Sequence, residues 1–151
     1  MRVSAKADYA VRAAVELAAA GEGPLKGDRI AEAQEIPSNF LENILSDLRN
    51  AGIVMSRRGA DGGYWLARPA EEVSIADVIR AVDGPLANVR GVRPAQLEFP
   101  GKAEKMRDVW VAVRANLRDV LENVTLADVA TGDLPEHVSA LAAAPEAWEE
   151  P

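Results

Sequence analysis

LRNAGIVMSRRGADGGYWLARP, residues 48–69, is the stretch that decides the fold expected for this chain. A helix is predicted to run to Ala51 and to end at Gly52, because glycine adopts the left-handed cap conformation without a steric penalty. Residues 53–58 and 64–67 have the composition of strands, and residues 59–63 (GADGG) tolerate the positive φ of a tight turn. A helix that leads into a hairpin with arginines at its turn is typical of winged helix-turn-helix proteins. The expected fold class is therefore mainly α with a small β-hairpin wing.

The composition excludes several kinds of chemistry. The chain has 151 residues, of which 48% are hydrophobic, enough for one packed domain with an accessory segment. It has no cysteine, which removes disulfides, thiolate nucleophiles and thiolate-ligated metal sites. The single histidine, His137, is expected to be a surface residue. No nucleophile–base pair, phosphate loop or metal-ligand spacing occurs, so we predict no catalytic residue, no metal site and no enzymatic activity.

The sequence also bears on where the protein works. No apolar run approaches the roughly eighteen residues needed to span a bilayer. The first twenty residues lack the order of basic region, apolar run and cleavage site of a secretory signal. We therefore predict a cytoplasmic protein.

Charge is distributed unevenly along the chain. The net charge of −7 is unfavourable for binding to nucleic acid. Residues 1–68 contain nine basic and nine acidic residues, whereas the remainder contains eight basic and fifteen acidic ones. Any DNA contact must therefore come from a local basic surface in the first half.

Three helices are predicted before the hairpin, over residues 4–20, 26–34 and 38–51. Ser4 is the expected N-cap of the first helix. Lys6 and Tyr9 lie near its start, where amide hydrogens and a cation can meet a phosphate. The alternative is that Lys6 is solvated and that Tyr9 covers the core.

The third helix has two distinct faces. An apolar stripe at helical spacing points inward: Leu41, Ile44, Leu45 and Leu48. Ser38, Asn39 and Asn43 lie on the other face near the start of the helix, where a recognition helix presents side chains to base edges. The alternative is an ordinary polar helix surface.

The predicted wing strengthens the DNA-binding interpretation. Arg57 and Arg58 precede its turn, and an arginine at a wing tip can enter the minor groove or pair with phosphate. Gly62 and Gly63 would allow a close approach of the backbone to DNA. With Arg49 and Arg68, these arginines are the main local source of positive charge.

Residues 1–84 resemble the BadM/Rrf-two-type winged helix-turn-helix regulators, the family that includes IscR, NsrR and CymR. The resemblance is carried by the start MRVS with Lys6, Tyr9 and Ala10, by residues 30–32 (IAE), 40–42 (FLE), 48–54 (LRNAGIV), 56–59 (SRRG), 62–64 (GGY) and 66–69 (LARP), and by 75–85 (IADVIRAVDGP). It implies a homodimeric transcription factor, a repressor that binds a palindromic operator of double-stranded DNA with the third helix in the major groove and the wing in the minor groove. The residues assigned to DNA binding are Lys6, Tyr9, Ser38, Asn39, Phe40, Asn43, Arg49, Arg57, Arg58, Gly62 and Gly63.

The loop predicted over residues 85–101 departs from the family pattern. In cluster-binding members this region carries three cysteines that hold iron and sulfur, whereas here it offers residues such as Asn88, Arg93 and Gln96. Asp8 occupies a place where some members supply a carboxylate ligand, but one carboxylate does not hold a cluster. No cofactor is therefore expected.

Residues 102–134 are predicted to form a long dimerisation helix, over 102–124, and a short closing helix, and residues 135–151 a loose tail. The long helix has an apolar stripe, assigned to a dimer interface: Met106, Val109, Trp110, Val113, Leu117, Val120 and Val124. The alternative is packing within one chain.

The sequence leaves the regulatory signal open. One possibility is an effector protein that docks on the dimer. Another is a small ligand between the winged domain and the long helix, with Trp65, Trp110 and the 85–101 loop as walls. A rival function is that of a protein-interaction module which has lost DNA binding, as the acidic balance favours.

Overall fold

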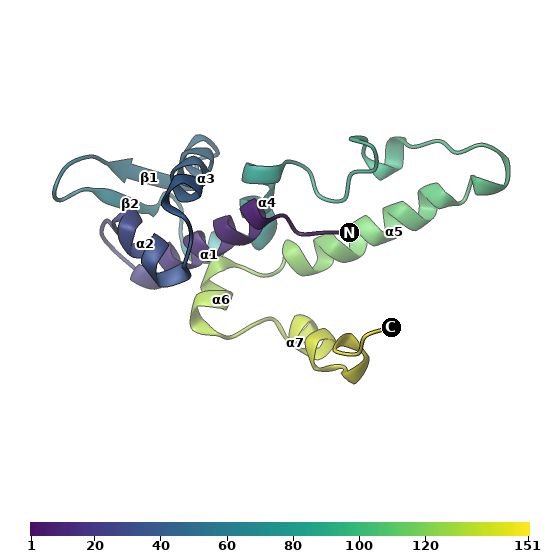
Figure 1. Ribbon diagram of the computed structural model, residues 1–151. Helices are drawn as coiled ribbons and strands as arrows, with labels where there is room; N and C mark the ends of the chain where they lie inside the picture. Colours follow the sequence, from purple (N-terminus) through teal and green to yellow (C-terminus); the bar gives the residue numbers. More distant parts are fainter.

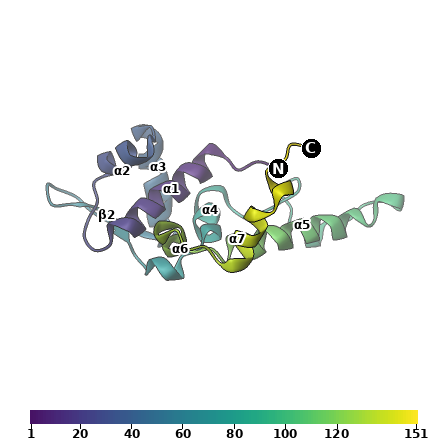
Figure 2. The same ribbon diagram turned by 90° about the horizontal axis from the view of Figure 1, so that it is seen from below.

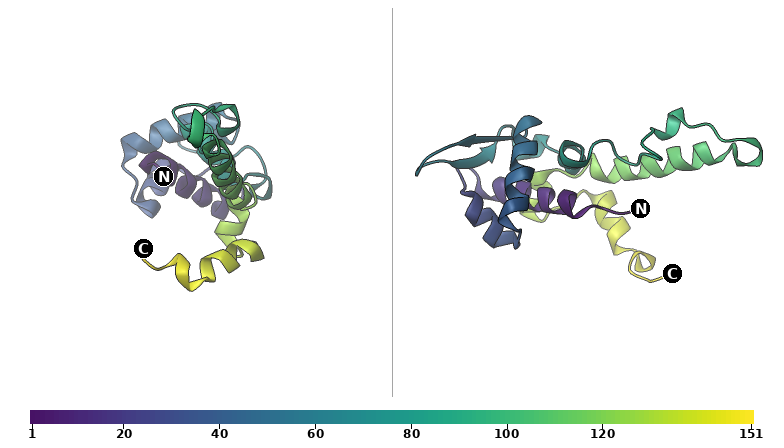
Figure 3. Two further views of the ribbon diagram at one scale, coloured as in Figure 1. Left: turned by 90° about the vertical axis from the view of Figure 1, so that its right-hand side faces the viewer. Right: turned by 45° about the horizontal axis from the view of Figure 1, so that its top comes forward.

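The computed structural model describes residues 1–151 and has an elongated shape (Figure 1). A cluster of short helices lies in the middle, the β-hairpin projects at one end, and a long helix projects at the other. The right-hand view of Figure 3 shows the same separation of the hairpin from the far end of the long helix. None of the helices is long and apolar enough to cross a membrane.

The chain is mainly helical, as the sequence predicts. The helices are α1 (Ala5–Ala20), α2 (Gly27–Gln34), α3 (Ser38–Asn50), α4 (Ile75–Asp83), α5 (Met106–Leu121), α6 (Leu126–Thr131) and α7 (Glu136–Ala143), and the strands are β1 (Val54–Arg57) and β2 (Gly63–Leu66). Short 3₁₀ turns connect several of them: Ala70–Glu72, Pro94–Gln96, Gly101–Ala103 and Pro145–Ala147.

Helix α1 is the centre of the winged domain. Its N-cap is Ser4, whose hydroxyl accepts a hydrogen bond from the Ala7 N–H, as predicted from the sequence. Ala10, Ala13 and Ala14 are fully buried, and their small side chains let the neighbouring helices approach closely. The core that forms around them takes its large side chains from α2, α3 and the start of β1: Ile30, Leu41, Ile44, Leu45, Leu48 and Val54.

The hairpin forms the predicted wing. β1 and β2 are antiparallel, with Val54 opposite Leu66 and Arg57 opposite Gly63. Leu25 pairs with Tyr64 on the other side of β2, and its amide and carbonyl both form hydrogen bonds of 2.8 Å with Tyr64. The wing is therefore anchored to the segment before α2 as well as to its own strands.

Two capping boxes bring the end of the long helix back to the winged domain. Ser74 and Asp77 cap α4, and Thr125 and Asp128 cap α6 in the same way. The two caps pair with each other, because the Ile75 N–H donates to the Val124 carbonyl and the Leu126 N–H donates to the Val73 carbonyl, both at 2.9 Å. The long helix therefore leaves the winged domain from a fixed point.

The C-terminal half differs from the sequence-based expectations in three places. The long helix spans Met106–Leu121 rather than 102–124, because residues 101–103 form a separate 3₁₀ turn. The loop after α4 is folded back on α5, with Pro94 and Leu97 buried and Val89 paired with Val92. The tail, expected to be loose, contains α7 and a terminal 3₁₀ turn.

Candidate nucleic-acid interface

The start of α3 presents a surface of polar and aromatic side chains. Ser38, Asn39, Phe40 and Asn43 are exposed there, while the other face of α3 is buried in the core. Pro37 supports this geometry, because it directly precedes the first helical residue and has no amide hydrogen to leave unpaired. The arrangement lets the first turns of α3 reach base edges while the core holds the helix rigid.

Helix α1 supports α3 from one side. Lys6 Nζ forms an ion pair of 2.7 Å with Asp47 Oδ2 on α3, so its charge is partly neutralised within the chain. The ring of Tyr9 packs edge-on against Phe40, with 6.1 Å between ring centroids. Arg12 lies over the other side of Tyr9 at 5.0 Å and donates a hydrogen bond to the Gln34 carbonyl. The contact joins the N-terminal turns of α1 and α3 into one surface.

The turn of the wing carries the free positive charge of this region. Arg58 is exposed and its side chain makes no hydrogen bond or ion pair within the chain. Arg57 instead donates to the Asp61 carbonyl at 2.9 Å, which closes the turn. Lys26 donates to the Gly59 carbonyl at 2.7 Å, so a second cation lies beside the wing tip.

The other arginines of the predicted basic surface are held within the chain. Arg49, in the last turn of α3, donates to the Ser56 hydroxyl at 3.1 Å. Arg68 forms an ion pair of 3.6 Å with Asp77 on α4. Arg49 therefore orients the wing relative to α3, whereas Arg68 stabilises the end of the hairpin against α4.

Gly62 and Gly63 have a different role from the predicted approach to DNA. Both are buried. A Cβ on Gly62 would lie 2.0 Å from the Arg57 carbonyl oxygen, and one on Gly63 would lie 2.7 Å from the Leu25 carbonyl oxygen. Gly63 also has a φ of 147°. These glycines are required for the wing to close on itself, and their contact with DNA stays a prediction.

The predicted dimer stripe also needs one correction. Val124 follows the end of α5 and is buried in the core of its own chain, so it cannot lie at an interface. None of the sixteen residues of α5 itself is buried, and Val109 is 46% exposed. The remaining stripe residues Met106, Val109, Trp110, Val113, Leu117 and Val120 lie on a helix that the rest of the chain covers only partly.

The region that corresponds to the cluster loop does not fit an iron–sulfur cluster. Cysteine is absent from the chain, and no group of three histidine or acidic side chains is close enough to hold a metal ion. The loop is held by protein contacts instead: Arg90 lies over the ring of Phe99 at 5.8 Å, and Leu97 is buried. Asp8 forms an ion pair with Arg12 at 3.0 Å.

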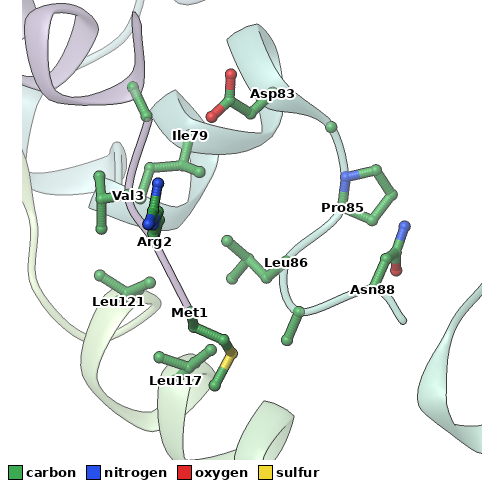
Figure 4. Close-up of a pocket in the computed structure, with 13 residues that line it drawn as sticks. Met1, Arg2, Val3, Ile79, Asp83, Pro85, Leu86, Asn88, Leu117 and Leu121 are labelled. Atoms are coloured by element: carbon green, nitrogen blue, oxygen red, sulfur yellow. The ribbon is translucent and has the colours of Figure 1, made fainter. Parts of the chain in front are cut away.

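A cavity of about 480 Å³ lies where the winged domain meets α5 (Figure 4). Leu117 and Leu121 form its wall on α5, Ile79 and Asp83 come from α4, and Leu86 comes from the loop. The N-terminal segment with Met1, Arg2 and Val3 covers it. The predicted walls Trp65 and Trp110 do not line this cavity. Trp65 lies in the wing, and Trp110 lies in the first half of α5, before the wall residues Leu117 and Leu121.

An ion cluster links α4 to α5 beside this cavity. Glu122 accepts hydrogen bonds from Arg118 at 2.8 Å and from Arg80 of α4. The bond from Arg118, together with that from Arg80, lowers the pKa of Glu122 to about 2. At the C-terminal end of α4, the Ser4 hydroxyl donates to Asp83 Oδ2 at 2.5 Å. The junction between the two parts of the chain is therefore built from polar links around an apolar cavity.

The sequence pattern of the Rrf2 family, described as iron-dependent transcriptional regulators, matches residues 3–132. The chain belongs to the Rrf2 family. The matched segment contains the winged domain, α5 and α6, and the family consists of transcriptional regulators rather than enzymes.

Individual relatives agree with the family match. The HTH-type transcriptional regulator Rv1287 of Mycobacterium tuberculosis strain H37Rv is 56% identical over 143 residues, which cover 94% of this chain and 89% of that protein. The structure of CymR (YrzC), the global cysteine regulator of B. subtilis, has a TM-score of 0.75 at 33% identity and covers 87% of this chain and 98% of that one. The structure of T. potens IscR has a TM-score of 0.69 at 34% identity, and the alignment covers 100% of this chain and 93% of that one.

These observations identify a regulator of the DNA-binding winged-helix class, and the residues predicted to contact DNA differ in how free their side chains are. Ser38, Asn39, Phe40, Asn43 and Arg58 are exposed, whereas Lys6, Tyr9, Arg49 and Arg57 are engaged in contacts within the chain. Sequence reasoning missed Lys26 and Arg12. A lysine in the cap position of α2 was the available signal for the first. The contact of Arg12 with Tyr9 depends on the packing of α1 against α2 and α3.

Proposed function

We propose that this chain acts as a homodimeric, sequence-specific repressor in the cytoplasm, which binds a palindromic operator and works without an iron–sulfur cluster. The start of α3 enters the major groove, and Arg58 at the wing tip enters the adjacent minor groove or pairs with phosphate. A small ligand or an effector protein controls the affinity for the operator.

The exposed start of α3 and the free arginine of the wing carry this proposal. Asn39 and Asn43 can form bidentate hydrogen bonds to adenine, and Ser38 can serve several bases. Arg58 has no partner inside the chain, so its guanidinium is available to phosphate. Both elements are held by the winged core, which limits the entropy lost on binding.

The long helix supports the homodimer. α5 has sixteen residues and no buried side chain, although its apolar stripe extends over four turns. At 1.5 Å per residue it is roughly 24 Å long. Pairing of two such helices about a two-fold axis, in antiparallel orientation, places the two winged domains at opposite ends. This separation suits half-sites about 34 Å apart.

The cavity beside α4 supports control by a small ligand. Its volume of about 480 Å³ lies within the range of small-molecule sites. It is lined by α4 of the winged domain and by α5, so a ligand there contacts both parts of the molecule. Such a ligand shifts DNA affinity only if it binds the DNA-competent and incompetent arrangements differently.

The proposal is tested by fluorescence anisotropy with labelled DNA from the protein's own upstream region. Asn39→Ala should weaken specific binding by about tenfold or more, because a base contact is worth about 1–3 kcal/mol. Arg58→Ala should weaken binding to any duplex and reduce the slope of affinity against salt by about one. Arg93→Lys is the control, since it changes an exposed arginine in the loop far from the wing and keeps the charge of that loop.

Two results would contradict the assignment. Unchanged operator affinity in both Asn39→Ala and Arg58→Ala, at fixed salt, would remove these residues from the interface. Absence of any salt-dependent DNA binding by the parent protein would instead favour a protein-interaction module.

A further inference from the structure

We infer that the acidic tail of one protomer, residues 133–151, docks on the basic distal arm of a second copy of this chain. The distal arm is residues 86–111, which comprise the loop after α4 and the first turns of α5. The inference rests on the proposed homodimer and adds a contact outside the pairing of the two α5 helices. The tail lies beyond residues 3–132, the segment that matches the family pattern.

The tail has a single sign of charge. It contains five carboxylates and no lysine or arginine: Asp133, Glu136, Glu146, Glu149 and Glu150. All five are exposed, and none forms an ion pair within the chain. A cluster of unpaired like charges repels itself, and a basic surface would relieve this repulsion.

The distal arm has the opposite balance. It contains five basic residues, Arg90, Arg93, Lys102, Lys105 and Arg107, against three acidic ones, Glu98, Glu104 and Asp108. Lys105 and Arg107 share one partner, Asp108, at 3.5 and 3.9 Å, and Arg93 and Lys102 have none. The distal arm therefore has a net charge of +2, and Arg93 and Lys102 are among its basic side chains without an ion-pair partner.

Apolar side chains accompany the charges on both surfaces. Trp148 is 79% exposed, although its ring N–H donates a hydrogen bond of 2.5 Å to the Ala142 carbonyl. Leu141 on α7 is also exposed. On the arm, Val92 and Val111 are exposed and lie outside the apolar stripe of α5. An indole held rigid in water loses little conformational freedom when a partner covers it, which is the property of an interface anchor.

The path of the chain brings the two surfaces together in an antiparallel dimer. The start of α7 lies beside the C-terminal half of α5 (Figure 2), because His137 Nε2 is 3.4 Å from the Asp119 carbonyl oxygen, and the rest of the tail continues below α5 in Figure 1. In an antiparallel pair, the first turns of the partner's α5 lie beside the last turns of this one. The partner's distal arm therefore arrives next to this chain's tail.

The tail is not placed to cover the DNA surface of its own protomer. In Figure 1 the wing projects on one side of the helical cluster, whereas α7 and the C-terminus lie on the other side, below α5. The charge pattern and the antiparallel pairing of the α5 helices therefore both favour the distal arm of a second copy as the surface that the tail binds.

A charge exchange tests the inference in the full-length protein. Glu146→Lys, Glu149→Lys and Glu150→Lys together should raise the dimer dissociation constant about tenfold in analytical ultracentrifugation at low salt, and Lys102→Glu, Lys105→Glu and Arg107→Glu together should do the same. Combining all six should restore the parent value, because each reversed charge meets a reversed partner. High salt should reduce the differences.

A cross-link distinguishes contact between chains from contact within one chain. The chain has no cysteine, so Pro151→Cys and Ala103→Cys each introduce a single thiol. Mixing the two variants, each with a tag of different size, should give a bismaleimide cross-linked heterodimer. The double variant, diluted until it is monomeric, should give no internal cross-link.

The outcomes separate this inference from the proposed function. A parent protein that is dimeric and binds DNA, but whose dissociation constant is unaffected by either triple variant, overturns the tail contact and leaves the proposed function intact. An internal cross-link in the monomer, or no rescue in the sixfold variant, also overturns it. A monomeric parent that binds no DNA overturns both.

Discussion

Helices α3 and α5 have similar apolar stripes but opposite surroundings. Four of the thirteen residues of α3 are buried, namely Leu41, Ile44, Leu45 and Leu48, whereas none of the sixteen residues of α5 is buried. The first stripe is covered by α1, α2 and the wing of the same chain. The second projects from the winged domain and is covered only in part by the loop folded on it (Figure 3). The same periodicity thus serves folding in one helix and, we propose, association in the other.

The largest expected effect is on the free energy of unfolding, through the buried apolar stripe of α3. Ile44→Ala should lower the free energy of unfolding by about 2–5 kcal/mol, because it removes a fully buried side chain and leaves a cavity. Val109→Ala, on the exposed stripe of α5, should change it by less than about 0.5 kcal/mol when the protein is monomeric. Urea unfolding at low protein concentration measures both, and equal losses would show that α5 is part of the same core.

A charge introduced into the apolar stripe of α5 should weaken dimerisation rather than folding. Val109→Glu should weaken the dimer on the order of a hundredfold, since pairing would bury an unpartnered carboxylate. The melting temperature of the monomer should stay unchanged, because Val109 is half exposed there. Sedimentation velocity over a concentration series gives the dissociation constant. A dimer as tight as the parent's would exclude this face of α5 from the interface.

A smaller effect is expected from the turn of the wing. Gly62→Ala places a methyl group 2.0 Å from the Arg57 carbonyl oxygen, so the hairpin must distort and Arg58 must move. We expect about a tenfold loss of DNA affinity by anisotropy, similar to the loss of one phosphate contact. The helical content in circular dichroism should not change. Ala60→Ser, at an exposed turn position, is the control and should bind DNA as the parent does.

The smallest effect concerns the junction between the two regions. The pKa of Glu122 is lowered from 4.5 to about 2 by its hydrogen bonds with Arg118 and Arg80. A lowered pKa in the folded state contributes stability above pH 4.5, and this contribution is lost as the pH falls through about 2. Glu122→Gln should therefore be less stable than the parent near neutral pH. The difference between their urea midpoints should shrink below pH 4.5, and a constant difference would assign the effect to packing.

Much of the winged domain follows from local sequence. The Ser4 cap, the capping box at Ser74 and Asp77, and the apolar stripe of α3 all appear where the pattern predicts them, since each depends on residues within a few positions of one another. The turn of the wing is also predictable, because residues 59–63 are rich in glycine. The role of Gly62 and Gly63 is not, because it depends on the position of Arg57 and Leu25 in space.

The sequence predicts where the candidate site lies, but it does not predict which of its charged side chains are paired. Ser38, Asn39 and Asn43 are exposed as expected, because they lie opposite the apolar stripe of one helix. Lys6 is paired with Asp47 and Lys26 lies beside the wing tip, and neither fact is visible along the chain. Ion pairs between distant residues are set by how α1 and α2 pack against α3 and the wing.

The amino-acid sequence by itself determined the order of helices and strands, the absence of cysteine chemistry and the polar face of α3 that we propose as the DNA contact. These are properties of local spacing and composition. The tertiary structure decided which arginines are free, why Gly62 must be glycine, and that α5 leaves the winged domain with its apolar face only partly covered. Each of these depends on contacts between residues far apart in the chain, for which periodicity carries no information.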